Sequence, residues 1–153
     1  MSMRYVVVTK QDCPTCRLVE PVLAELAKAA EVRVFNQDAA DFPRVPGARV
    51  VFDESLEESW GFGIEIVPTL LRLDGDAEIE RTEGWDRDAW RAATGLASLG
   101  AALPPLRPGC GSLTRDPSVE PRLRDRFGDP RLSARKLELA PLEDPLEACF
   151  ERG

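Results

Sequence analysis

The sequence predicts an α/β fold in which a central mixed β-sheet is flanked by helices, in the order β-α-β-α-β-β-α. An apolar run rich in β-branched residues, residues 4–9, precedes a segment with helical periodicity over residues 13–30. A second strand-like run, residues 32–35, follows that helix, so we expect the two strands to form a parallel crossover. Two more strand-like runs surround Asp74-Gly75, a dipeptide that favours a hairpin turn.

The later elements follow from local signals. A short helix is predicted over residues 54–60, and the two glycines that follow, Gly61 and Gly63, are expected to end it. The hairpin strands are predicted over residues 69–73 and 78–82. Asp86 is expected to cap a last helix that runs to residue 97, with apolar side chains along one face.

Composition excludes several classes of function. The chain has 153 residues, 43% of them hydrophobic, so it can bury a core, and its net charge of −7 argues against a nucleic-acid partner. No apolar run is long enough to span a membrane, and the N-terminal one is too short for a signal peptide, so we expect a cytoplasmic protein. The sequence has no histidine, which excludes Ser-His-Asp and Cys-His catalysis and histidine metal ligands.

Charge and proline divide the chain into two parts. Residues 1–98 hold 11 Lys and Arg against 18 Asp and Glu, whereas residues 99–153 hold nine of each. Five of the 13 prolines lie in the first part and eight in the second. We therefore expect a folded acidic domain over residues 1–98 and a Pro-rich C-terminal extension that docks on it or leads to a further module.

The motif that carries chemistry is Cys13-Pro14-Thr15-Cys16, between the first strand and the first helix. A Cys-x-x-Cys motif in this context is typical of a redox pair. Cys13 falls at a helix N-terminus, where free N–H groups and the helix dipole stabilise a thiolate. Cys16 lies one turn later and is placed to resolve a mixed disulfide, and Pro14 suits the first helical turn.

Two other interpretations of the motif stay open. Both cysteines can be inert buried thiols, or they can form half of a zinc or iron–sulfur site. A four-thiolate site would have to recruit Cys110 and Cys149, which are single cysteines rather than a second Cys-x-x-Cys. We therefore expect no metal and no cofactor.

Several spaced motifs over about residues 4–98 resemble the thioredoxin family. In that family the second cysteine is followed by a basic residue and, five positions after the cysteine, by a proline; here these are Arg17 and Pro21. A Tyr-Gly-Ile motif followed by Ile-Pro-Thr-Leu also has its counterpart, in Phe62-Gly63-Ile64 and Val67-Pro68-Thr69-Leu70. The hairpin dipeptide and the glycine before the last helix, Gly84, fit the same pattern.

The resemblance implies a thioredoxin fold and a thiol–disulfide oxidoreductase that reduces a protein disulfide, with a reductase as electron donor. It implies that Cys13 is the nucleophile, that Cys16 resolves the mixed disulfide, and that an extended substrate pairs with the backbone beside a cis Val67-Pro68 bond. The substrate-binding residues that it implies are Val67, Pro68, Thr69 and Trp85.

Three positions depart from the family pattern. Asp12 replaces a tryptophan before Cys13; it either opposes the thiolate or, as we favour, caps the helix. Val7 stands where the family buries an aspartate, which leaves water or Glu20 to accept a proton. An insert, ADFPRVPGARVVFDE, contains a strand-like piece at residues 49–52, and we expect it to be a decorative loop rather than a docking surface.

Two alternative functions remain from the sequence. The first is a glutathione-dependent reductase, because Pro-Thr between the two cysteines resembles the motif of glutaredoxins. The segment Glu83-Gly84-Trp85-Asp86, however, resembles the glutathione-binding turn of that family only weakly. The second alternative is a non-catalytic binding module, which keeps the fold and docks a partner through its extension.

The extension contains a cysteine between two glycines, Cys110. It is either an extra redox partner of the Cys13/Cys16 pair or, as we favour from the sequence, an incidental thiol. If the extension docks, we expect apolar side chains to anchor it, namely those of Leu99, Leu103, Leu106, Leu146 and Phe150. Its last apolar stretch also contains Cys149 and is too short to form a stable helix alone.

Overall fold

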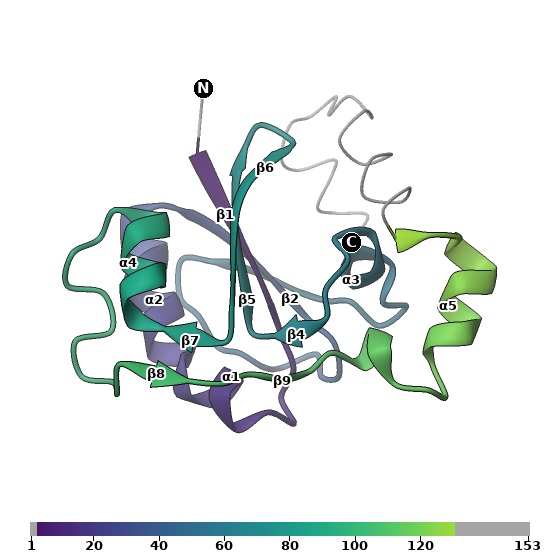
Figure 1. Cartoon of the computed structure of the whole chain (residues 1–153). Helices are drawn as coiled ribbons and strands as arrows, with labels where there is room; N and C mark the ends of the chain where they lie inside the picture. The colour runs from purple at the N-terminus through teal and green to yellow at the C-terminus, as the bar shows by residue number, and fades with distance from the viewer. Residues whose placement is uncertain (1–2, 131–153) are drawn as a thin grey trace.

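The computed structural model describes residues 3–130. At its centre lies a five-stranded mixed sheet in the order β3-β2-β1-β5-β6 (Figure 1). Its strands are β1 (Met3–Thr9), β2 (Glu31–Asn36), β3 (Arg49–Phe52), β5 (Thr69–Asp74) and β6 (Ala77–Glu83). Strands β1 and β2 are parallel and β5 and β6 are antiparallel, which confirms the predicted crossover and hairpin.

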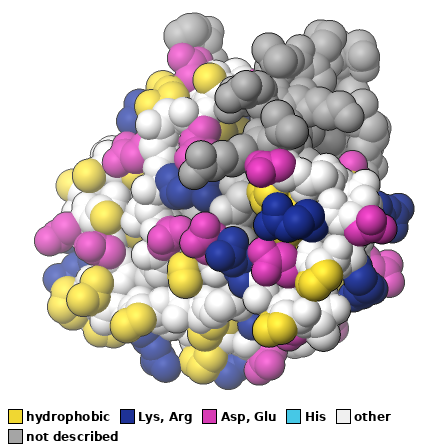
Figure 2. Space-filling model, turned by 45° about the vertical axis from the view of Figure 1, so that its right-hand side comes forward, with side chains coloured by type: hydrophobic (Ala, Val, Ile, Leu, Met, Phe, Trp, Pro, Cys, Tyr) yellow, Lys and Arg dark blue, Asp and Glu magenta, His cyan; other side chains and the backbone are white. Residues whose placement is uncertain are grey.

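Helices surround the sheet: α1 (Pro14–Leu18), α2 (Glu20–Ala29), α3 (Glu57–Gly61), α4 (Arg87–Thr94) and α5 (Glu120–Phe127). Helices α2 and α4 lie side by side, at the left in Figure 1, while α3 and α5 lie at the opposite end of the molecule. Within residues 3–130 no helix is long and apolar enough to cross a membrane. The space-filling view in Figure 2 shows basic and acidic side chains interspersed on the face that it displays.

The first predicted helix is divided in two. Helix α1 ends at Leu18 and α2 begins at Glu20, with Val19 between them. Pro21 lies in the first turn of α2, where the N–H that it lacks would have no partner in the new helix. Pro21 therefore begins a second helix rather than kinking one continuous helix.

The hairpin turn and the last helix differ from the prediction by small shifts. Because Asp74 pairs with Ala77, the two-residue turn consists of Gly75 and Asp76 rather than Asp74 and Gly75. The first turn residue, Gly75, has φ +64°, a conformation that favours glycine. Helix α4 has the predicted Asp86 cap, but it ends at Thr94, before a left-handed glycine.

The expectation that the insert is a decorative loop is wrong. Its strand-like piece is β3, which pairs in parallel with β2 along the edge of the central sheet. Within the same insert, Phe42 is buried against the core and precedes a cis peptide bond to Pro43. The insert is therefore part of the domain's own architecture.

Two apolar clusters cover the two faces of the sheet. The first contains alternate side chains of β1 and β2, such as Val7 and Val34, packed beneath α2 and α4. The second contains the other alternate side chains, such as Val6 and Val8, together with Cys13 and Cys16. Because successive strand side chains point to opposite faces, one apolar strand supplies both clusters.

The described part of the extension, residues 99–130, runs along the domain in short paired segments. Strand β8 (Leu106–Arg107) pairs with β7 (Trp85–Asp86), and β9 (Cys110–Gly111) pairs with β4 (Ile66–Val67). A 3₁₀ turn at Leu113–Arg115 then leads to α5, whose Leu123 packs on Leu56 and Trp60.

The predicted apolar anchors have mixed outcomes. Leu99 is buried in the first cluster and Leu103 packs against it, as expected. Leu106 is 64% exposed, so its prediction as an anchor is wrong; its strand is held by backbone pairing instead. The predictions for Leu146, Cys149 and Phe150 lie outside the described residues.

Candidate active site

The Cys-x-x-Cys motif forms the N-terminus of α1. Cys13 itself is the N-cap, and its Sγ accepts the N–H of Cys16 at 3.3 Å. The predicted Asp12 cap is therefore wrong, because the cysteine side chain already occupies that role. Pro14 takes the first helical position, as predicted, and is exposed.

The loop before Cys13 is held by a residue that the sequence did not single out. The carboxylate of Asp38, just after β2, accepts the N–H of Gln11 at 2.6 Å and that of Asp12 at 3.0 Å. Asp38 thereby fixes the backbone that leads into α1. An acidic residue at the carboxyl end of the neighbouring parallel strand was the available signal, since such strand ends meet at one edge of a sheet.

The two cysteines of the motif have opposite pKa shifts. The Cys16 thiol donates to the Cys13 sulfur and, with a smaller contribution from Cys110, lowers the pKa of Cys13 to about 5 against the opposing effect of burial. Burial raises the pKa of Cys16, and the negative charge on Cys13 raises it further. Near neutral pH Cys13 is therefore the thiolate and Cys16 the thiol, as a nucleophile and a resolving residue require.

The buried carboxylate that the resemblance to thioredoxins implies near the motif has no counterpart at Val7, Glu20 or Asp53. Val7 is fully buried in the first apolar cluster. Glu20 accepts the N–H of Arg44 at 2.7 Å. Asp53 is buried, but its carboxylate accepts hydrogen bonds from Ser59 and Glu58 at the start of α3.

Strand β4 lies beside the motif. The Val67-Pro68 peptide bond is cis, as the resemblance implies, and the Cys13 Sγ lies 3.7 Å from the Val67 carbonyl oxygen. Thr69 is buried, and its hydroxyl donates to the Ile66 carbonyl at 2.6 Å. The structure therefore brings the Val67-Pro68 bond next to Cys13, while the buried Thr69 stabilises the backbone of β4 through its hydrogen bond to Ile66.

Trp85 does not line the site. Its ring is fully buried, packs edge-on against Trp90 with centroids 5.2 Å apart, and its Nε1 donates to the Pro104 carbonyl at 2.7 Å. The expectation that Trp85 flanks a bound substrate gains no support from this position, which lies in the core. An apolar residue before a capped helix is equally compatible with a core position, which is the one it takes.

The edge of β4 is already paired. Strand β9 runs antiparallel to it, with Cys110 opposite Val67 and Gly111 opposite Ile66. This register places the Cys110 Sγ 2.8 Å from the Cys13 Sγ. Cys13 is consequently fully buried, although Cys13, Cys16 and Cys110 are all free thiols.

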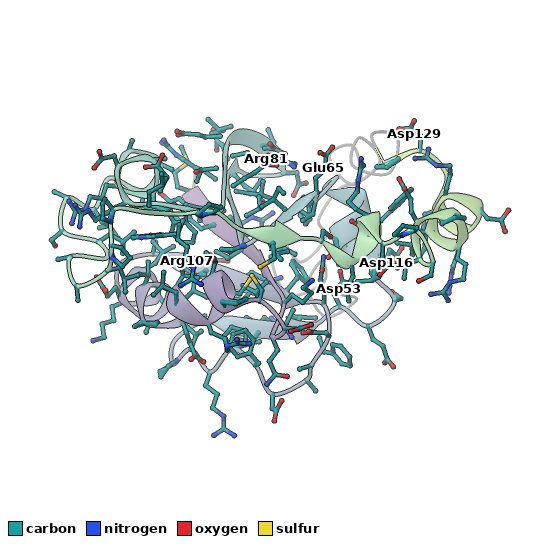
Figure 3. All side chains as sticks on the ribbon, turned by 60° about the horizontal axis from the view of Figure 1, so that its bottom comes forward. Asp53, Glu65, Arg81, Arg107, Asp116 and Asp129 are labelled. Atoms are coloured by element: carbon teal, nitrogen blue, oxygen red, sulfur yellow. The ribbon has the colours of Figure 1, made fainter. Side chains whose placement is uncertain are left out.

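Polar contacts hold the β9 segment, which we define as residues 108–114, on the site. Thr15 Oγ1 donates to the Pro108 carbonyl at 2.6 Å, so this motif residue serves the extension. The Lys10 ammonium donates to the Gly111 carbonyl at 2.9 Å. In Figure 3 the pale green strand of this segment crosses the molecule beside the yellow sulfur atoms.

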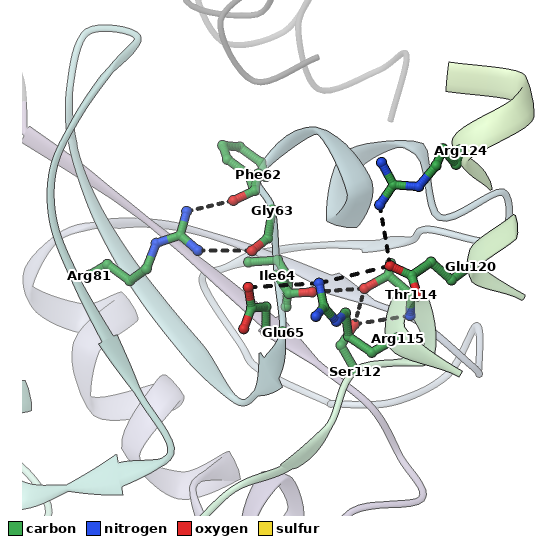
Figure 4. A network of polar contacts seen from close by, with 10 residues as sticks. All are labelled: Phe62, Gly63, Ile64, Glu65, Arg81, Ser112, Thr114, Arg115, Glu120 and Arg124. Atoms are coloured by element: carbon green, nitrogen blue, oxygen red, sulfur yellow. Dashed lines mark hydrogen bonds and ion pairs between the residues drawn. The ribbon is translucent and has the colours of Figure 1, made fainter. Parts of the chain in front are cut away.

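A second set of contacts fixes the far end of the segment (Figure 4). Thr114 Oγ1 donates to the Ile64 carbonyl at 2.7 Å, and the hydroxyls of Ser112 and Thr114 are 2.7 Å apart. Gln37 donates to Ser112 Oγ at 2.8 Å and accepts the N–H of Leu113 at 2.9 Å. The segment is therefore anchored on both sides of Cys110.

No group of three or more side chains that could hold a metal ion is found within residues 3–130. Cys149, which a four-thiolate site would need, lies outside those residues. The three described cysteines are joined to one another by sulfur hydrogen bonds. What this arrangement can do chemically is exchange disulfides.

Comparisons with known proteins give fold neighbours only. No protein-family model matches the chain, and no curated protein matches it. The exposed lipoprotein thioredoxin of Streptococcus pneumoniae has a TM-score of 0.53 and 19% identity, over 62% of this chain and 85% of that one. A conserved protein from Geobacillus kaustophilus has a TM-score of 0.51 and 17% identity, over 72% and 76% of the two chains.

A third similar structure is the thioredoxin of Malassezia sympodialis, with a TM-score of 0.45 and 19% identity, over 63% of this chain and 76% of that one. The pneumococcal neighbour has the mixed sheet and flanking helices seen here. The chain therefore has a thioredoxin fold, which confirms the fold that its sequence motifs imply.

Proposed function

We propose that the chain is a thiol–disulfide oxidoreductase that reduces a disulfide of a protein substrate through Cys13 and Cys16. The observation that carries this proposal is the asymmetry of the pair: Cys13 has a pKa of about 5 at a helix N-terminus, while burial raises the pKa of Cys16. An inert pair of core thiols needs no such difference. This difference in pKa suits Cys13 to attack a disulfide and Cys16 to remain protonated until the mixed disulfide has formed.

The reaction takes two exchange steps. The Cys13 thiolate attacks one sulfur of the substrate disulfide, forming a mixed disulfide and releasing the other substrate sulfur as a thiolate, which takes up a proton. Cys16 then loses its proton and attacks Cys13, which releases the second substrate thiol. The protein is left with a Cys13–Cys16 disulfide, which an external dithiol reductase returns to the reduced state.

Backbone pairing with β4 supports an extended protein substrate. The cis Val67-Pro68 bond places the Val67 carbonyl beside Cys13, and this edge accepts an antiparallel strand, as β9 demonstrates. A substrate that adds a strand here would bring its own disulfide sulfur to Cys13. A reductive role and three free thiols fit a reducing compartment, so we propose a cytoplasmic location.

The test is the reduction of insulin by dithiothreitol. We expect the protein to accelerate it, Cys13→Ser to abolish the acceleration, and Cys16→Ser to accumulate a mixed disulfide on Cys13. Leu106→Ala, a change at an exposed side chain, is the matched control that should keep full activity. An unaccelerated reaction, or equal activity in Cys13→Ser, would overturn the proposal.

One observation favours a second candidate, a binding module without catalysis: Cys13 is fully buried beneath the β9 segment. The same insulin assay separates the two, because a binding module gives no acceleration even when the segment is displaced. Glutathione dependence has less support. The Asp86 Oδ1 that would receive glutathione accepts the Ala89 N–H at 3.1 Å as a helix cap.

A further inference from the structure

We propose that Cys110 is a third redox-active cysteine, and that the β9 segment occupies β4 as a tethered substrate strand. In the oxidised protein Cys110 exchanges with the Cys13–Cys16 disulfide to form a Cys13–Cys110 disulfide. The proposal rests on the redox activity of the Cys13/Cys16 pair in the proposed function. It adds an internal partner for that pair.

The register between β9 and β4 places Cys110 beside Cys13. Strand β9 pairs antiparallel with β4, the edge that an extended substrate would use, and it places Cys110 directly opposite Val67. The Cys13 Sγ lies 3.7 Å from the Val67 carbonyl oxygen and 2.8 Å from the Cys110 Sγ. The extension thus presents a sulfur where a substrate would present its own.

The two glycines that flank Cys110 differ in the space around them. A Cβ atom at Gly109 would clash with the Val67 carbonyl oxygen and would lie 2.6 Å from Ile66 Cγ2. Gly111, on the other side of Cys110, has nothing within 4 Å of such an atom. Only Gly109 is therefore required for the close approach to β4, and the pair offers a matched set of substitutions.

Hydrogen bonds anchor the chain on both sides of Cys110. Before it, Thr15 of the motif binds the Pro108 carbonyl at 2.6 Å; after it, Thr114 binds the Ile64 carbonyl at 2.7 Å. An incidental linker thiol has no need of buried polar contacts that fix its position. These contacts hold the Cys110 sulfur next to Cys13, which raises the effective concentration of the two thiols.

The exchange balances without an added oxidant. Cys110 loses its proton to solvent and attacks Cys13; the Cys13–Cys110 bond forms as the Cys13–Cys16 bond breaks. Cys110 is thereby oxidised and Cys16 is reduced, and the Cys16 thiolate takes up a proton. The Cys13–Cys16 disulfide that starts the exchange is the product of substrate reduction, and an external dithiol later reduces the Cys13–Cys110 bond.

Such a bond would keep the β9 segment on β4 and exclude a second substrate until a dithiol reductant arrives. A reduced segment, held by non-covalent contacts alone, can leave and expose Cys13. The extension would therefore be locked on the site in the oxidised protein, whereas in the reduced protein, where it also lies on β4, it is free to dissociate.

The test maps disulfides in a Cys149→Ser background, which leaves three cysteines. The protein is oxidised with one equivalent of diamide, quenched with acid and N-ethylmaleimide, and digested with trypsin. We expect a disulfide that joins the peptide of residues 11–17 to the peptide of residues 92–115, with fragmentation placing it at Cys13. Cys16→Ser should retain this link, and Cys110→Ala should lack it.

Two further variants test the placement of the segment. Gly109→Val should lower the yield of the link by about tenfold, because the segment loses its close approach to β4. Gly111→Ala should leave the yield unchanged, and thermal melting checks that both variants fold. Equal yields in the two variants, or no link in either the parent protein or Cys16→Ser, would overturn the proposal.

The mapping needs no substrate, so its outcome separates from that of the insulin assay. A link without insulin reduction would reject the proposed function and keep the internal exchange. Insulin reduction without a link would keep the function and reject a redox role for Cys110.

Discussion

The domain, residues 3–98, and the described extension, residues 99–130, are stabilised in different ways. The domain buries large side chains on both faces of its sheet, whereas the extension buries few, among them Leu99 and Leu123. Between these two, the partly buried Leu103 and Leu113 pack on the apolar clusters, and short strand pairings and hydrogen bonds to carbonyl groups hold the segments that carry no buried apolar side chain. The domain is stabilised by its buried apolar core, whereas the extension is bound to the domain through hydrogen bonds and a few buried side chains.

This difference sets which part can move. Truncating one buried apolar side chain costs about 2–5 kcal/mol, whereas one intramolecular hydrogen bond contributes about 0.5–1.5 kcal/mol net. The β9 segment can therefore leave the site at a cost that does not unfold the sheet.

Trp85→Ala should have the largest effect. The ring is fully buried against Trp90, and its Nε1 donates to the Pro104 carbonyl, so the change removes core packing and one contact with the extension. We expect a loss of about 3–5 kcal/mol in the free energy of unfolding, measured by urea denaturation. A loss below about 1 kcal/mol would show that the domain core does not depend on this residue.

Thr114→Val should have an intermediate effect. It removes the hydroxyl that binds the Ile64 carbonyl and contacts Ser112 Oγ in a buried position. We expect a loss of about 1–3 kcal/mol in the same urea measurement, because the carbonyl is left without that donor. Thr114→Ser, which keeps the hydroxyl, is the control and should lose less; a loss in Thr114→Val no larger than that in Thr114→Ser would contradict the role of the hydroxyl.

The pH dependence of Cys13 alkylation tests the electrostatics at the junction of the two regions. Because the pKa of Cys13 is lowered to about 5, its alkylation rate should be level above that pH and fall about tenfold per pH unit below it. Cys110→Ala should move the inflection to higher pH, since it removes a thiol that donates to the Cys13 sulfur. Cys110→Ser, whose hydroxyl also donates, should not; an inflection near the ordinary thiol pKa in the unsubstituted protein would contradict the assignment.

Leu106→Ala should have the smallest effect. The side chain is 64% exposed and its strand is held by backbone pairing, so we expect a change within about 0.5 kcal/mol in the free energy of unfolding. A loss comparable to that of Leu99→Ala, which removes a buried side chain, would mean that apolar anchoring extends to β8.

The sequence predicts the domain better than the extension for a physical reason. Apolar periodicity reports on elements several residues long, so β1, α2 and the β5–β6 hairpin are recognisable from their own residues. Strand β3 is short and lies within an insert, and its pairing with β2 depends on distant residues, so its place in the sheet was missed.

Within the site, the motif cysteines follow from local spacing and the cis proline from the resemblance to thioredoxins, whereas the position of Cys110 follows from neither. Strands β4 and β9 have two residues each and are separated by more than 40 positions, which leaves no periodic pattern to recognise. The two glycines around Cys110 indicate flexibility in isolation. Only the folded chain shows that Gly109 allows close contact with Val67.

The rate of Cys13 alkylation by iodoacetamide at pH 7 tests most directly whether the β9 segment covers Cys13. We predict that Gly109→Val, which displaces the segment, reacts at least about threefold faster than the unsubstituted protein, because a larger fraction of molecules exposes Cys13. Gly111→Ala should react at the unsubstituted rate. Equal rates in all three proteins would contradict the placement of the segment over Cys13.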